Sequence, residues 1–145
     1  MKTENKVKQV KKSLEDIKVN IKIKISALWV AIMALYIYND FFSLYKPGIM
    51  EDMLQGNMGP FPVTQSALFS AAILMAIPAV MIFLSLAMKP RLNRIVNIIL
   101  GIVYVVVMVI SVQGEWMYYI FMGVVEIILT ALIVLLAIKW PRLEK

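Results

Sequence analysis

Cysteine and histidine are both absent from the 145-residue sequence. Without cysteine the chain has no disulfide, thiolate metal site, thiol nucleophile or CxxC redox centre. Without histidine it has no imidazole to bind a metal or haem, and no Ser-His or Cys-His pair for nucleophilic catalysis. The two absences exclude most hydrolytic and redox chemistry, and no motif in the sequence calls for a metal or a cofactor.

Apolar residues are abundant instead, at 61% of the chain, with a mean hydropathy of +0.82. Soluble domains are typically about 45–50% apolar, and one core of this size could not bury the surplus. Four apolar runs are each long enough to cross a bilayer as a helix, which takes about 20 residues. We therefore expect an all-α integral membrane protein, an up-down four-helix bundle with spans at 26–45, 63–88, 92–112 and 116–138.

Proline and glycine separate these spans. They occur in the segments 46–48, 89–91 and 113–115, where a helix is expected to end or turn. The loop after the first span contains residues 49–54, which are predicted to form a short interfacial helix. Pro78 lies inside the second span, and such a proline is tolerated in membranes when neighbouring groups satisfy the carbonyl that it frees.

The basic residues predict the orientation of the bundle. Fourteen of the fifteen lie in the N-terminal tail, the turn near residue 90 or the C-terminal tail, and Lys46 alone falls on the other side. Lysine and arginine near span ends mark the cytoplasmic side. We expect a multi-pass protein of the cell membrane with both termini in the cytoplasm. Aromatic residues at the expected interfaces are Trp29, Tyr45, Trp116, Tyr118 and Trp140.

Residues 1–24 form a lysine-rich tail ahead of the membrane domain, which covers residues 25–142. Apolar residues at helical spacing favour an amphipathic helix on the membrane surface. Anionic lipid is a possible partner for the lysines next to the bilayer, which are Lys11, Lys12, Lys18, Lys22 and Lys24. The alternative is that these lysines serve only to orient the first span. Nucleic-acid binding has little support.

Two acids lie within the spans, where an ionisable side chain costs about 2.5–3.5 kcal/mol at the bilayer centre. Glu126 is near the expected midplane, and Asp40 is near the outer end of the first span. Because these spans run in opposite directions, the acids differ in depth by roughly 5–7 Å. We expect both to border one pocket that opens outward.

Polar and small residues recur at helical spacing and predict which face of each span is internal. On the first span Trp29, Tyr36 and Asp40 share such a stripe, and Asn39 is a weaker member, 100° around the helix from Asp40. Candidate ligand- or ion-binding residues are Glu126, Asp40, Asn97, Tyr36, Tyr104, Tyr119 and Asn39. In the alternative interpretation, a protonated Glu126 only bonds a tyrosine or Asn97 and holds the helices together.

Several segments resemble a known family. They are YxYxDFFSLYKPG at 36–48, PAVMIFLS at 78–85, NRIVNIILGIVY at 93–104 and YYIFMGVVEI at 118–127. The resemblance covers residues 24–142 and is to small prokaryotic four-span proteins catalogued only as a domain of unknown function. It implies that Asp40, Asn97 and Glu126 belong to the family pattern. An acid that commonly precedes the second-span proline is replaced here by Ala76 or Ile77. A looser similarity, in size and topology, is to DoxX-like membrane proteins.

Three functions follow as hypotheses. The first is binding or transport of an ion, a proton or a small molecule by an acid-lined pocket, with Glu126 as the protonatable group, and with a homodimer as a plausible assembly. The second is an accessory subunit that binds another membrane protein. The third, less favoured without histidine, cysteine or a metal motif, is a lipid- or isoprenoid-modifying enzyme with Glu126 and Asp40 as acid and base.

Overall fold

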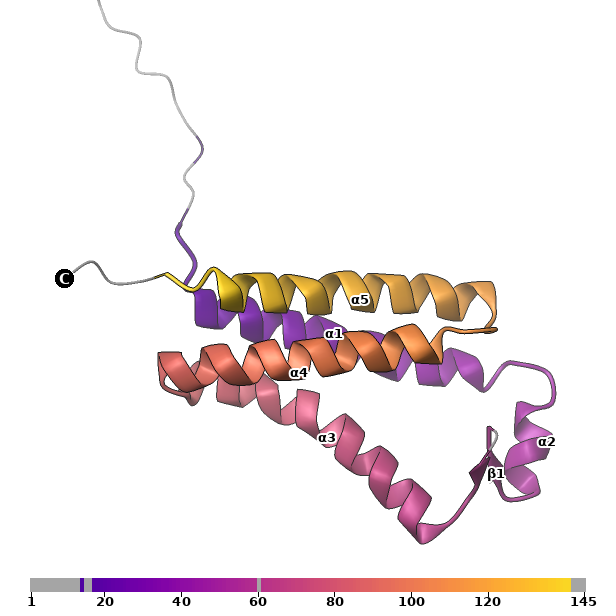
Figure 1. The fold of residues 1–145 in the computed structure, drawn as a ribbon. Coiled ribbons are helices and arrows are strands. Elements are labelled where there is room, and N and C mark those ends of the chain that lie inside the picture. The colour runs from indigo at the N-terminus through magenta and orange to yellow at the C-terminus, as the bar shows by residue number, and fades with distance from the viewer. Residues whose placement is uncertain (1–13, 15–16, 60, 142–145) are drawn as a thin grey trace, which may run out of the picture.

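The computed structural model describes residues 14, 17–59 and 61–141. Four long helices run alternately up and down and pack together (Figure 1). They are α1 (Ile21–Ser43), α3 (Gln65–Ala87), α4 (Pro90–Ser111) and α5 (Met117–Ile138). The loop between α1 and α3 contains α2 (Ile49–Leu54) and two short strands, β1 (Asn57–Met58) and β2 (Phe61–Pro62). The predicted all-helical bundle is confirmed.

The helix bounds agree with the predicted spans except at the start of α1. This helix begins at Ile21, where the Asn20 side chain caps it by accepting from the Lys22 N–H at 2.9 Å. Lys22 and Lys24 therefore belong to the first helix and not to the tail. Residues 17–20 precede that cap outside any helix. The rest of the predicted amphipathic tail helix, including Lys11 and Lys12, lies outside the described residues.

The loop after α1 contains the predicted interfacial helix at 49–54. The two-residue strands after it were not predicted, because so short a pair leaves no periodic pattern. They pair antiparallel, with Asn57 opposite Pro62 and Met58 opposite Phe61. The predicted turn between α4 and α5 is present, and Gly114 adopts a left-handed φ of 75° there, which a residue with a side chain rarely takes.

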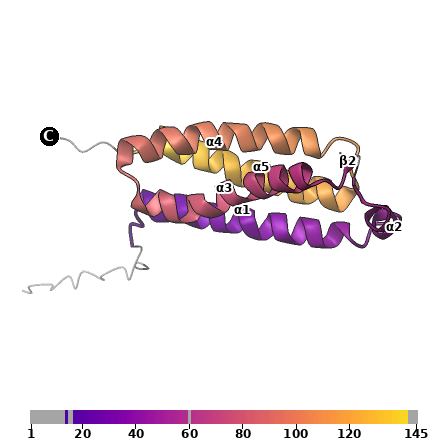
Figure 2. The same ribbon diagram turned by 90° about the horizontal axis from the view of Figure 1, so that it is seen from below.

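The two ends of the bundle differ in their connections. The start of α1, the α3–α4 turn and the end of α5 lie at one end, called here the basic end (Figures 1 and 2). The 44–64 loop and the α4–α5 turn lie at the other, called the loop end. At the basic end, Lys22 Nζ donates to the carbonyls of Leu86 and Met88 at 3.0 and 2.7 Å. Arg94 Nε donates to the Ala137 carbonyl at 3.1 Å. These cations satisfy carbonyls that the ends of α3 and α5 leave without partners.

Helices α4 and α5 approach closely because each places a glycine at the contact. A Cβ on Gly101 would lie 2.4 Å from Val134 Cγ2, and one on Gly123 would lie 2.3 Å from Val112 Cγ1. Small residues at such crossings are typical of helix packing in membranes. α1 packs against both α3 and α5, whereas α3 and α4 touch little.

Helix α3 is packed along only part of its length. Its buried residues are Pro78, Met81 and Ser85, all in the half near the basic end. None of residues 65–77 is buried, and Figure 1 shows α3 diverging from α4 toward the loop end. Helix α3 therefore has fully buried residues only near the basic end, and its backbone lies apart from α4 toward the loop end.

Large apolar side chains cover the outside of the bundle. Phe83 and Phe121 are each 68% exposed, and leucine, isoleucine and valine are exposed on all four long helices. All four are long and apolar enough to cross a membrane. A surface of this kind is compatible with lipid and not with water.

Candidate functional site

Buried polar side chains near the basic end bond to one another. Trp29 Nε1 donates to Asn97 Oδ1 at 2.8 Å, and Asn97 Nδ2 donates to Asn93 Oδ1 at 2.6 Å. Asn93 Nδ2 in turn donates to the Ser85 carbonyl at 2.5 Å. We call Trp29, Asn97 and Asn93 the polar ladder. It ties α1, α4 and α3 together and meets its own hydrogen-bonding needs, although the Ser85 hydroxyl beside it has no partner in the described chain.

Pro78 is accommodated by a side chain from another helix. Because proline has no N–H, the carbonyl four residues earlier, that of Leu74, loses its helical donor. The Tyr104 hydroxyl of α4 donates to that carbonyl. A neighbouring group that satisfies the freed carbonyl was expected from the sequence, and in the structure this group is the Tyr104 hydroxyl.

Glu126 lies on α5 in the interior and is 1% exposed. Neither of its carboxyl oxygens has a hydrogen-bond partner within the described residues. The same holds for Oδ1 of Asn39 on α1, whose side chain is 2% exposed. The interior toward the loop end thus contains three acceptor atoms and no donor paired with them.

A contact between α1 and α5 sets the relative depth of these two residues. The Ser43 and Tyr118 hydroxyls are 3.0 Å apart. Asn39 lies one turn below Ser43, and Glu126 lies about two turns below Tyr118. At 1.5 Å per residue the two side chains differ in depth by roughly 6 Å. They therefore occupy neighbouring levels of the same interior.

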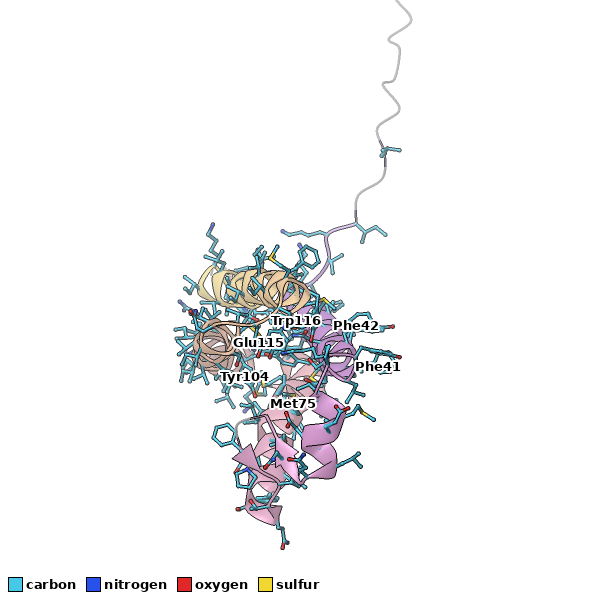
Figure 3. The ribbon with its side chains drawn as sticks, turned by 90° about the vertical axis from the view of Figure 1, so that its right-hand side faces the viewer. Phe41, Phe42, Met75, Tyr104, Glu115 and Trp116 are labelled. Atoms are coloured by element: carbon cyan, nitrogen blue, oxygen red, sulfur yellow. The ribbon has the colours of Figure 1, made fainter. Side chains whose placement is uncertain are left out.

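Aromatic rings line this part of the interior. Tyr36 and Tyr104 are buried, with ring centroids 6.5 Å apart, and Trp29 meets Tyr104 edge-on at 5.9 Å. In Figure 3, which looks along the bundle from the loop end, Tyr104 and Met75 lie toward the centre and Phe41 and Phe42 project outward from α1. Glu126 lies within electrostatic range of Tyr36 and Tyr119.

The interior face of α1 differs from the predicted one. Its buried residues are Ile25, Ser26, Trp29, Ile32, Tyr36 and Asn39. Asn39, ranked as the weaker member, is inside, whereas Asp40 is exposed on the flank of the bundle. The face is centred on the bulky rings of Trp29 and Tyr36, and the next residue after Asn39 is rotated 100° away from it. Asp40 remains within electrostatic range of Glu126 and Tyr119.

The other candidates are placed as follows. Glu126, Tyr36 and Tyr104 are interior, as expected, and Tyr119 is half-buried. Asn97 is also interior, but it bonds Trp29 and Asn93 and not Glu126. Within the described residues, neither a tyrosine nor Asn97 donates a hydrogen bond to the Glu126 carboxyl, as the alternative interpretation required.

Trp29 was predicted on the inward-facing stripe of the first span. It is fully buried and donates to Asn97, which confirms that placement. Asn93 and Ser26 were missed as interior polar residues. Asn93 precedes Asn97 by one helical turn, and that spacing was the available signal. Tyr45, Trp116 and Tyr118 instead line a largely apolar hollow of about 560 Å³ at the loop end, together with Phe41, Phe42 and Lys46.

Charges near the site are few. In the part of the chain that the structure describes, the one ion pair joins Lys46 Nζ to Glu115 Oε2 at 2.6 Å, at the loop end. No group of three metal-binding side chains occurs among the same residues. Glu126 therefore has no basic partner from within the described bundle.

A bundle of four long apolar helices around a buried acid defines a four-span integral membrane protein. Residues 13–145 match the sequence profile of the family of unknown function DUF6326, and the chain belongs to this family. The resemblance seen in the sequence is thereby confirmed. No curated protein and no solved structure is significantly similar to the chain.

Proposed function

We propose that this protein binds a proton or a cation inside the membrane, with Glu126 as the exchanging group. The observation that carries the proposal is the buried Glu126 carboxyl, with both oxygens unpartnered within the described residues. Burial of an ionised carboxylate without a partner is strongly unfavourable. The group therefore holds a proton when the site is empty and exchanges it for a positively charged ligand.

The remaining residues of the site have distinct roles in this proposal. Asn39 supplies a further acceptor, and Tyr36 and Tyr104 supply ring faces around the ligand. Asp40 lies on the flank with Tyr119 and attracts cations toward the site without contacting them inside. The polar ladder closes the path to the basic end.

The proposed orientation follows from the charges. The basic end faces the cytoplasm, as lysine and arginine near span ends require. The ligand then enters from the opposite side, where α3 diverges from α4 and none of residues 65–77 is buried. Access from one side and closure at the other are what a binding or alternating-access protein needs.

Carbodiimide labelling tests the proposal. An apolar carbodiimide reacts with protonated carboxyl groups inside membranes, and mass spectrometry locates the adduct. We expect modification at Glu126 in the purified protein, progressively less of it as the pH rises, and none in Glu126→Gln. Glu51→Gln, on the exposed helix α2, serves as the control and should label as the wild type does. An unlabelled Glu126 at every pH would contradict the proposal.

A second candidate function is that of an accessory subunit that binds another membrane protein. The exposed half of α3 and the exposed Asp40 favour it, since both leave bundle surface to be covered. Co-purification from native membranes under mild detergent distinguishes the two. A stoichiometric partner lost on substitution of α3 surface residues would favour the accessory role, and a homogeneous monomer or homodimer would count against it.

A further inference from the structure

The unpartnered atoms near Glu126 also restrict what the ligand is. We infer that the site takes a protonated primary amine attached to an apolar body, an inference that rests on the proposed function and narrows it.

Once Glu126 has given up its proton, all three unpaired atoms are acceptors: Asn39 Oδ1 and the two oxygens of Glu126. An acceptor is satisfied only by a donor, and a primary ammonium group carries three N–H donors and no acceptor. A quaternary ammonium has no N–H and would leave the Asn39 oxygen unpaired. An anion or a neutral carbonyl would add acceptors to a site that already has too many.

The unpaired acceptors lie on two helices that pack against each other, Asn39 on α1 and Glu126 on α5. We infer that the ammonium group bridges these helices where the described bundle leaves its acceptors unpaired.

The rings and the charge select an organic cation over a metal ion. Tyr36 and Tyr104 present aromatic faces, which attract ammonium groups. Divalent metal ions such as Ca²⁺ and Mg²⁺ bind about six or more oxygens, and three protein acceptors fall short of that number. One carboxylate balances one positive charge. The apolar body of the amine would lie toward Met75 of α3, a partly buried side chain that packs against the core.

Proton balance follows from the charges. The ammonium enters, Glu126 gives up its proton to solvent, and the occupied site is neutral overall. One proton is therefore released for each amine bound. The other titratable groups facing Glu126 are Asp40 and Tyr36 on α1 and Tyr119 on α5. The tyrosines stay neutral near pH 7, since an ordinary tyrosine ionises only near pH 10. Asp40 is on the exposed flank.

Calorimetry with a matched pair of probes tests the inference. The probes are 2-phenylethylamine and its N,N,N-trimethyl analogue, titrated into the purified full-length protein in two buffers of different ionisation enthalpy. We expect the primary amine to bind at least tenfold more tightly than the trimethyl analogue, with release of one proton. Asn39→Leu should weaken the primary amine about tenfold and leave the analogue unchanged, a selective loss that misfolding would not produce.

The controls separate this inference from the proposed function. Glu126→Gln should abolish proton release while keeping the elution profile and thermal unfolding of the wild type. Equal affinity for both probes, or proton release on addition of NaCl without amine, would overturn the inference. So would absence of amine binding in a protein whose Glu126 is still labelled by carbodiimide, and in that case the proposed function would stand. Absence of both binding and labelling would overturn the two together.

Discussion

Both halves of the bundle bury polar side chains, but the halves differ in how far these side chains are hydrogen-bonded. Near the basic end, Trp29, Asn97 and Asn93 bond to one another, and Lys22 and Arg94 cap the helix ends. Toward the loop end, Asn39 and Glu126 are just as buried and their acceptor atoms have no donor in the described chain. Satisfied polar networks fix a single packing, whereas unsatisfied groups destabilise it until something binds them. We propose that the difference separates a scaffold from a site.

The largest expected effect comes from breaking the polar ladder. Asn97→Leu leaves the Trp29 N–H and the Asn93 side chain without their partner, in a buried position. We expect a loss of about 2–4 kcal/mol in the free energy of unfolding, because each buried orphan costs about 1–3 kcal/mol. Reversible unfolding in mixed detergent micelles measures it. Asn39→Leu is the matched control at the other end and should be nearly neutral. Equal losses in the two variants would erase the distinction between the halves.

The contact at the boundary between the halves should give a smaller effect. Tyr104→Phe removes the donor to the Leu74 carbonyl, which Pro78 has deprived of its helical partner. We expect a loss of about 1–3 kcal/mol, the cost of a buried unsatisfied carbonyl. Pro78→Ala restores an N–H to that carbonyl, so Tyr104→Phe should cost much less in that background. A double-mutant cycle measures the coupling, and additive effects would refute the assignment.

Removing the Lys22 cap at the basic end should lower the free energy of unfolding by a smaller amount. Lys22→Met keeps the apolar stem and removes the ammonium that bonds the Leu86 and Met88 carbonyls. Because Lys22 is only half-buried, we expect a loss of about 1 kcal/mol, near that of other helix-end interactions. Lys18→Met, at an exposed position just before α1, is the control. A change as large for Lys18 as for Lys22 would show that total charge matters and the cap does not.

The smallest expected change is at Glu126 itself. Glu126→Met replaces a buried polar group by an apolar one of similar size. Because Glu126 makes no side-chain hydrogen bond within the described bundle, the fold should lose no stability, and a gain of about 1 kcal/mol or more is the direction expected for such replacements. Thermal unfolding of the empty protein is the measurement. A clear loss would mean that Glu126 holds the bundle together, as the alternative interpretation of the sequence has it.

The sequence predicts the helices well and the interior less well. Long apolar runs bounded by proline and glycine indicate where helices start and stop, and even the short helix at 49–54 follows from its neighbours. The interior face of α4, with Asn97, Gly101 and Tyr104, also follows from spacing. The face of α1 does not, because Asn39 and Asp40 are adjacent and both polar. Which one turns inward depends on how Trp29 and Tyr36 pack against α4.

Periodicity also does not predict which side chains bond to each other across helices. Spacing places Trp29, Asn97 and Glu126 on interior faces but does not predict their partners. Asn97 was expected near Glu126, and it bonds Trp29 and Asn93 instead. The relative depth of α1, α4 and α5 depends on loop geometry and on the close contacts at Gly101 and Gly123. With depths set by the structure, Trp29 reaches Asn97, and Glu126 lies one level away with no donor.

Infrared difference spectroscopy tests the central claim most directly. The carbonyl stretch of a protonated carboxylic acid is distinct from that of a carboxylate, and Glu126→Gln identifies the band that belongs to Glu126. We predict a protonated Glu126 band in the empty protein at neutral pH, which disappears on raising the pH or on adding 2-phenylethylamine. A carboxylate band for Glu126 in the empty protein, unchanged by pH or by any cation, would contradict the account.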